Sequence, residues 1–177
     1  MIELILGGVK SGKSKLAEQQ AINSGLDVIY LATAMKEFNG QTDPSMLQRI
    51  KTHELQRPDH WSVIEEPILL ADRLLEQASE HKTLLVDCLT LWLTNLLLNN
   101  DPTLIKQETD KLIEALPRLK GHIIFVSNET NMGVIPTSQL ARRFCDEAGI
   151  LHQTLASLSD RVILTVAGLP HVLKGTL

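Results

Sequence analysis

Gly7-Gly8-Val9-Lys10-Ser11-Gly12-Lys13-Ser14 decides the fold, because this stretch fits the pattern G-x-x-x-x-G-K-[ST]. It follows an apolar run at residues 2–6 and precedes a helical pattern at residues 13–24. Strand, loop and helix in this order predict a phosphate-binding loop, where glycines let backbone N–H groups surround phosphates and the helix adds its dipole. Lys13 is expected to reach the β and γ phosphates, and Ser14 to ligate magnesium. A chance match in a glycine-rich turn is the weaker interpretation, because the predicted strand before the loop and the predicted helix after it agree with the motif.

Short apolar runs recur along the rest of the chain, with longer helical patterns between them. This alternation predicts an α/β, P-loop NTPase-like fold with a mostly parallel central sheet covered by helices on both faces. The predicted strands are residues 2–6, 27–32, 83–87, 122–127 and 161–166. The predicted helices are residues 13–24, 68–80, 89–99, 103–119 and 137–148, with Gly149 stopping the last.

The length of 177 residues suits one domain over residues 1–177, and no internal repeat or linker composition divides the chain. A polar segment at residues 36–66 is far longer than an ordinary connection, so we expect it to be functional or disordered. The helix predicted at residues 89–99 is apolar nearly all round. Such a helix is either buried in the core or half of an oligomer interface.

Composition excludes one class of partner. The charges sum to 17 − 21 = −4, and two Trp, one Tyr and three Phe are the aromatic residues, so a basic, stacking nucleic-acid surface is not expected. Cys88 and Cys145 stand far apart in no metal or disulfide spacing, which suits a reducing cytosol. The apolar runs are too short for a signal peptide or membrane span. We therefore expect a cytoplasmic protein with no membrane span.

Two acids follow predicted strands. Asp87 ends the strand at residues 83–87 and is a candidate second magnesium ligand, although a helix N-cap is its other interpretation. Glu129 follows the strand at residues 122–127, where it could sense the γ phosphate or be an ordinary loop acid. Because ligands of open α/β sheets bind at the carboxyl ends of the strands, both acids are expected on the same edge as the phosphate loop.

The phosphate loop predicts a nucleotide but no particular reaction. The guanine motif Asn-Lys-x-Asp of small GTPases is absent, and Asp87-Cys88-Leu89-Thr90 does not fit Asp-x-x-Gly. A small-molecule kinase or transferase is therefore favoured over a switch. A simple kinase without a covalent step and a nucleotide-gated regulatory module are the alternatives.

A histidine in the polar segment is a candidate nucleophile. Residues 43–45 resemble a helix start, and a helix running to about residue 56 places Arg49 and His53 on one face. A histidine beside arginines near a triphosphate can attack phosphorus, and the arginines would neutralise charge on the phosphate oxygens. An exposed helical histidine is the other interpretation, and His60 is the rival for the role.

Further motifs occur in a fixed order after the phosphate loop: Tyr30-Leu31-Ala32-Thr33, Arg49-Ile50-x-x-His53, Arg57-Pro58-x-His60-Trp61, and Asn128-Glu129 with Met132-Gly133-x-x-Pro136. Together they resemble the bifunctional adenosylcobinamide kinase/adenosylcobinamide-phosphate guanylyltransferases of cobalamin synthesis. The resemblance runs from about Leu6 to Gly168, almost the whole chain. The His53 segment and the Asn-Glu motif are more specific than the phosphate loop.

The resemblance implies a two-step enzyme. It would phosphorylate adenosylcobinamide with ATP or GTP, and then transfer GMP from GTP to that phosphate with release of pyrophosphate. His53 matches the family histidine that carries GMP covalently. The resemblance also implies magnesium bound with the nucleotide, nucleotide contacts at Thr33 and Arg57, and a homotrimer.

Guanine recognition needs a carboxylate facing the N1 and N2 hydrogens of the base, and Glu65 is the candidate. An ordinary surface acid is the alternative for this residue. The chain also departs from the family at His152-Gln153, where Asn-Gln is common, and at Glu129-Thr130-Asn131, where Glu-Val-Gly is common. Some members have a second histidine at Thr52 and a glutamate at Asp87. These departures leave the predicted fold and the assignment of His53 intact, and they weaken a detailed assignment of the acceptor pocket.

Overall fold

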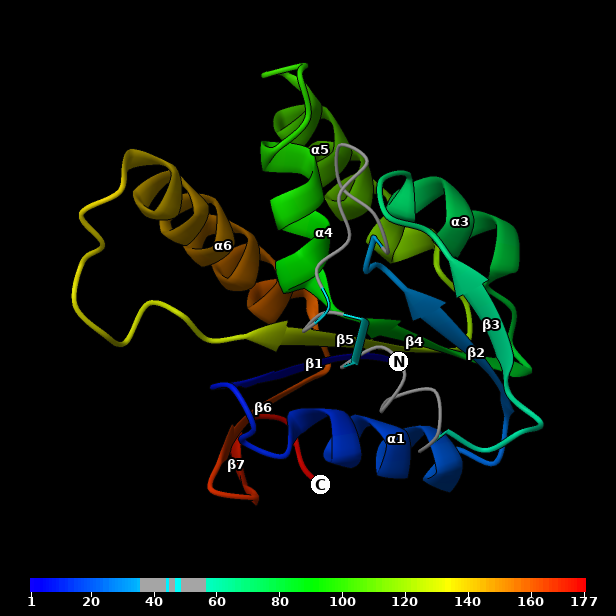
Figure 1. Ribbon diagram of the computed structural model, residues 1–177. Coiled ribbons are helices and arrows are strands. Elements are labelled where there is room, and N and C mark those ends of the chain that lie inside the picture. Colours follow the sequence, from blue (N-terminus) through cyan, green and yellow to red (C-terminus); the bar gives the residue numbers. More distant parts are fainter. Residues whose placement is uncertain (36–43, 45–46, 49–56) are drawn as a thin grey trace.

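The computed structural model describes residues 1–35, 44, 47–48 and 57–177, and within them one sheet has the strand order β3-β2-β4-β5-β1-β6-β7 (Figure 1). Neighbouring strands run parallel, except that β6 and β7 are antiparallel. The strands are β1 (Ile2–Gly7), β2 (Asp27–Ala32), β3 (Ser62–Glu65), β4 (Lys82–Asp87), β5 (His122–Asn128), β6 (Arg161–Val166) and β7 (Leu169–Lys174).

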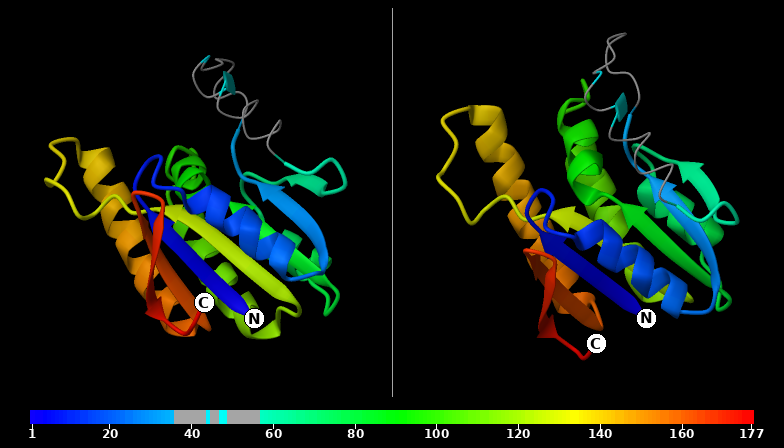
Figure 2. Two further views of the ribbon diagram at one scale, coloured as in Figure 1. Left: turned by 90° about the horizontal axis from the view of Figure 1, so that it is seen from below. Right: turned by 60° about the horizontal axis from the view of Figure 1, so that its bottom comes forward.

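Helices cover both faces of the sheet, as Figures 1 and 2 show. Helix α1 packs on one face, and the other helices pack on the opposite face, so the predicted α/β fold class is confirmed. The helices are α1 (Lys13–Asn23), α3 (Leu70–Gln77), α4 (Leu89–Leu97), α5 (Leu104–Ala115), the 3₁₀ turn η1 (Leu116–Arg118) and α6 (Gln139–Leu158). None of the helices in the described residues is long and apolar enough to span a membrane.

The five predicted strands are confirmed as β1, β2, β4, β5 and β6. They could be recognised in the sequence because parallel strands are buried on both faces and therefore appear as continuous apolar runs. Strands β3 and β7 were not predicted. They are the two edge strands, their side chains are mostly exposed, and β7 contains Pro170. An edge strand needs no buried alternation, so its sequence lacks the pattern that identifies a strand.

The prediction that Gly149 ends the last helix is wrong, because α6 continues to Leu158. Ala148, Leu151 and Leu155 form a buried stripe across the glycine. Burial of this stripe outweighs the roughly 1 kcal/mol that glycine costs inside a helix.

Helix α4 is a core helix, which confirms one of its two interpretations. Leu89, Trp92, Leu93 and Leu96 are buried, and the helix packs against β5, α5 and α6. The buried Asn95 side chain donates hydrogen bonds to the carbonyls of Thr33 and Pro67. The apolar faces of α4 are therefore filled largely by its own chain.

Candidate active site

The phosphate loop joins β1 to α1 and packs tightly against β6. A methyl group added to the buried Gly7 would lie 2.2 Å from the Thr165 hydroxyl and 2.3 Å from that of Ser11, so only glycine fits there. The Ser11 and Thr165 hydroxyls share a hydrogen bond of 2.9 Å, and the Gly168 N–H donates to the Ser11 carbonyl. Gly12 has a φ of 97°, a left-handed conformation that glycine adopts freely. Contacts with β6 and with the turn after it thus fix the loop.

Lys13 begins α1 and folds back over the loop. Its Nζ donates to the Gly8 carbonyl at 3.0 Å, and only 9% of the residue is exposed. Burial lowers the pKa of Lys13, while the nearby charge of Asp87 opposes this shift. The ammonium group therefore lies at the loop, within electrostatic reach of the acid that ends β4.

Asp87 ends β4 on the α1 face of the sheet. Its Oδ2 accepts a hydrogen bond of 2.6 Å from the Tyr30 hydroxyl. Burial, and then the charge of Asp87, raise the pKa of Tyr30, so the phenol remains a donor at neutral pH. Cys88 occupies the N-cap position of α4, and no side chain caps that helix, so the N-cap interpretation of Asp87 is wrong.

Thr33 follows β2 and supports the end of β4. The Asp87–Cys88 peptide bond is cis, and the fully buried Thr33 hydroxyl both donates to the Cys88 carbonyl and accepts from its N–H. Burial raises the pKa of Cys88 to about 12, which marks an unreactive thiol. Nucleotide contact by Thr33 stays a prediction, because this side chain faces the backbone of β4.

Arg57 lies over the ring of Tyr30. Its guanidinium carbon is 4.2 Å from the centroid of the Tyr30 ring. Trp61 is buried in the same core cluster as Tyr30, which anchors the segment after Arg57, whereas His60 is exposed. Glu65 is exposed at the end of β3, two strands from Asp87, and its guanine contact stays a prediction.

A series of hydrogen-bonded polar side chains lies at the end of β5, beside the phosphate loop. The Glu129 N–H donates to the Gly7 carbonyl at 3.0 Å. The Ser127 hydroxyl is 2.8 Å from Nε2 of His152 on α6 and 3.3 Å from the Thr90 hydroxyl. Burial lowers the pKa of His152, and Glu129 opposes that shift. The sequence marked His152 as a departure from the family but did not show its contact with Ser127, because a histidine in a helical pattern gives no sign of a partner on a distant strand.

The predicted nucleophile His53 lies outside the described residues. The same holds for Arg49, for Thr52 and for most of the helix predicted at residues 43–56. Within the described residues, Lys13 lies within electrostatic reach of Asp87, and Tyr30 contacts both Asp87 and Arg57. The position of His53 relative to these residues stays a prediction.

The donor set at this edge fits magnesium bound together with a nucleotide. The described residues contain no group of three or more His, Cys, Asp or Glu side chains able to hold a metal ion. Mg²⁺ commonly takes one or two carboxylates and completes its shell with phosphate oxygens and water. Asp87 supplies a carboxylate and Ser14 a hydroxyl, both of the ligand type that Mg²⁺ prefers, and magnesium binding by these two residues stays a prediction.

Comparisons with known proteins give one family. A family model described as cobinamide kinase / cobinamide phosphate guanyltransferase matches residues 3–173. The bifunctional adenosylcobalamin biosynthesis protein CobP of Pseudomonas aeruginosa is 53% identical over 99% of this chain and 98% of its own length. The bifunctional adenosylcobalamin biosynthesis protein CobU of Escherichia coli is 34% identical over 96% of this chain and 97% of its own.

Solved structures agree on the fold. A Pyrococcus horikoshii protein gives a TM-score of 0.57 at 10% identity, covering 99% of this chain and 87% of its own. An ATPase of a bacterial type III secretion system gives 0.50 at 16% identity, covering 92% of this chain and 50% of its own. At such identities the likeness shows the P-loop NTPase fold alone.

Proposed function

The chain belongs to the cobinamide kinase / cobinamide phosphate guanyltransferase family, and from that premise we propose that it transfers first a phosphoryl group and then GMP to adenosylcobinamide. The products would be adenosylcobinamide phosphate and then adenosylcobinamide-GDP. This assigns the chain to cobalamin biosynthesis, as a kinase and a guanylyltransferase in one domain over residues 1–177. One observation carries the proposal: the tightly packed phosphate loop, Lys13 and Asp87 meet at one sheet edge in a chain with full-length bifunctional relatives.

The phosphate loop performs the first step. Its N–H groups and Lys13 hold the β and γ phosphates of ATP or GTP, while the aminopropanol hydroxyl of adenosylcobinamide attacks the γ phosphorus and the nucleoside diphosphate leaves. Ser14 and Asp87 would hold Mg²⁺, which when bound offsets the negative charge of the phosphates. Tight packing of Gly7 against Thr165 keeps the loop in one conformation, so the donor groups are organised before the nucleotide arrives.

His53 carries the second step. Its imidazole attacks the α phosphorus of GTP, a phosphorus–nitrogen bond forms and pyrophosphate leaves. The phosphate of the acceptor then attacks the same phosphorus and releases the histidine. Arg57 neutralises charge on the phosphate oxygens, and only three residues separate it from His53 in the sequence, a span of at most about 14 Å. Glu65 accepts the N1 and N2 hydrogens of guanine, and Thr33 holds the end of β4.

Labelling with α-labelled GTP tests the covalent step. The protein should acquire a label that is lost in acid and retained in base, as a phosphoramidate requires. The His53→Ala variant should acquire none. His60→Ala is the matched control, because it removes the nearest exposed histidine of the same segment and should label normally.

The alternatives predict other results. A simple kinase transfers the γ phosphate to adenosylcobinamide but acquires no label from the α position. A regulatory module binds nucleotide without transfer to any corrinoid. Label that persists in His53→Ala contradicts the assignment of the nucleophile.

The homotrimer implied by the resemblance is checked by sedimentation equilibrium, where a monomer would contradict it.

A further inference from the structure

Tyr30 links two charged groups that the proposed function uses in different ways. It lies on β2 and is 4% exposed. Its hydroxyl donates to Asp87 Oδ2 at 2.6 Å, and its ring lies beneath the Arg57 guanidinium at 4.2 Å. One rigid side chain thus contacts both the acid at the end of β4 and the arginine that follows the histidine segment.

The strand register explains how these contacts arise. Tyr30 lies opposite Leu85 in the parallel pair β2–β4, and Asp87 stands two residues further along β4. Residues two apart point to the same face, and a diagonal neighbour is within reach of an aromatic side chain. This is the face that α1 covers, where Tyr30 packs with Ala17 and Ala21. The phenol therefore extends along the sheet toward the edge that carries Lys13.

The position of Asp87 depends on this contact. A carboxylate at the end of a strand can rotate about its side-chain bonds, and a short hydrogen bond from a buried donor fixes one rotamer. The Tyr30 bond occupies Oδ2, so Oδ1 is the oxygen of this carboxylate that we assign to a cation. The ring, in turn, is one of the contacts that restrict the rotamers of the Arg57 side chain.

We propose that Tyr30 is a positioning residue whose hydroxyl aligns Asp87 for magnesium nucleotide and whose ring aligns Arg57 for GMP transfer. The inference rests on the proposed function for the roles of Asp87 and Arg57. The two contacts of Tyr30 can be removed separately by substitution. Tyr30→Phe removes the hydrogen bond and keeps the ring, whereas Tyr30→Leu removes both.

The first measurement is binding of the β,γ-imido analogue of ATP, by calorimetry, in magnesium and in EDTA. Tyr30→Phe should weaken binding in magnesium about tenfold, a typical cost for a lost hydrogen bond to a charged group, and leave binding in EDTA unchanged. A merely structural role would weaken binding in both conditions. Equal magnesium dependence in wild type and Tyr30→Phe overturns the role of the hydroxyl.

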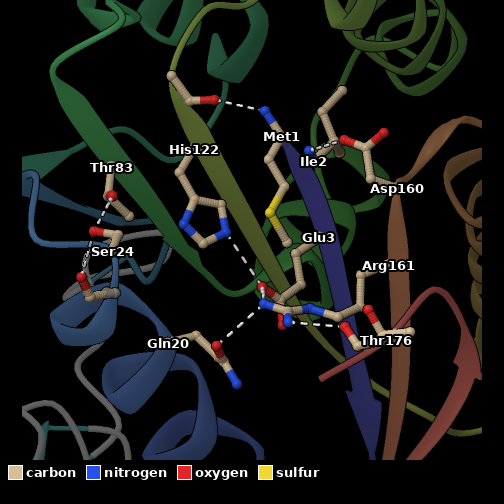
Figure 3. Close-up of polar contacts among 12 residues, drawn as sticks. Met1, Ile2, Glu3, Gln20, Ser24, Thr83, His122, Asp160, Arg161 and Thr176 are labelled. Atoms are coloured by element: carbon tan, nitrogen blue, oxygen red, sulfur yellow. Dashed lines mark hydrogen bonds and ion pairs between the residues drawn. The ribbon is translucent and has the colours of Figure 1, made fainter.

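Two controls make this comparison specific. Thr83→Val removes another buried hydroxyl from the same strand pair, the one 2.7 Å from Ser24 Oγ (Figure 3), and it should preserve the magnesium dependence. In an Asp87→Asn background, Tyr30→Phe should have no further effect on the magnesium dependence. A further loss in that background would show that the hydroxyl acts elsewhere, and would overturn the proposal.

The second measurement is the rate of labelling by α-labelled GTP at saturating magnesium. Tyr30→Phe should label at nearly the wild-type rate, and Tyr30→Leu about three to ten times more slowly, because only the latter loses the ring beneath Arg57. Equal rates in both variants overturn the role of the ring. If wild type acquires no label, the proposed covalent step fails, while the binding comparison still decides the role of the hydroxyl.

Discussion

His152 shows how a single buried residue makes stability depend on pH. The side chain is 7% exposed and accepts or donates one hydrogen bond, to the Ser127 hydroxyl. Burial disfavours the imidazolium and lowers the pKa of His152, and the opposing charge of Glu129 is the smaller effect. The unfolded chain, in which the pKa is near the ordinary 6.5, therefore binds the proton first as pH falls.

The sign of the resulting pH dependence follows from linkage. Below about pH 6.5 the unfolded state binds more protons at this site, so the free energy of unfolding should fall as pH drops from 7.5 to 5. His152→Asn, which keeps a hydrogen-bonding group and cannot charge, should show a smaller fall in urea titrations at the two pH values. His171→Asn is the control, because this histidine is exposed and should leave the fall unchanged. An unaltered fall in His152→Asn would contradict the burial argument.

At the scale of elements, α6 shows why one prediction from the sequence was wrong. Glycine is common just past the C-terminal end of a helix, but Gly149 lies inside α6, under the loop that joins β5 to α6. The Asn131 side chain donates to the Cys145 carbonyl at 3.0 Å, and a methyl group on Gly149 would lie 2.9 Å from that same amide nitrogen. Glycine here makes room for the loop, a requirement set by residues 18 positions away.

This crowding gives a double-variant prediction. Alanine gains about 1 kcal/mol over glycine inside a helix. Gly149→Ala should therefore stabilise by about that amount in an Asn131→Ala background, where nothing crowds the methyl group. In wild type the gain should be smaller, because the Asn131 amide must move. Urea unfolding of the four proteins measures the difference, and equal gains in both backgrounds would exclude the proposed crowding.

The elements that could be predicted are those whose pattern is local. Five buried strands and the phosphate loop are visible as apolar runs and as glycine spacing, and the edge strands β3 and β7 are not. The residues of the site likewise fall into those that a local sequence pattern predicts and those that it does not. Lys13 and Asp87 follow from motif and strand end, whereas the contacts of Tyr30 depend on β2 and β4 being neighbours, which no pattern of apolar residues specifies.

At the scale of the whole molecule, polar residues gather at both ends of the strands and have different roles at the two ends. The carboxyl ends of the strands carry the proposed site, and the opposite ends carry a buried charge network (Figure 3). Glu3 of β1 is fully buried, and its Oε2 lies 2.7 Å from the Arg161 guanidinium and 3.2 Å from His122 Nε2. Arg161 also donates to Gln20 of α1 and to the Thr176 carbonyl, so the network ties three strands, α1 and the C-terminal residues together.

Removing one charged side chain from this network should lower the free energy of unfolding far more than removing both partners of the ion pair. Glu3→Leu leaves the buried Arg161 charge without its carboxylate and should destabilise by about 3–5 kcal/mol, whereas the double variant Glu3→Leu with Arg161→Met should regain most of that loss. Nucleotide affinity below the melting temperature should stay at the wild-type value in both, because the network lies at the end of the sheet away from the phosphate loop. Urea unfolding and calorimetric titration measure the two quantities on the same samples. A loss of affinity in the stable double variant would show that the two edges are coupled through β1, whose first residues bear Glu3 and whose last is Gly7 of the loop.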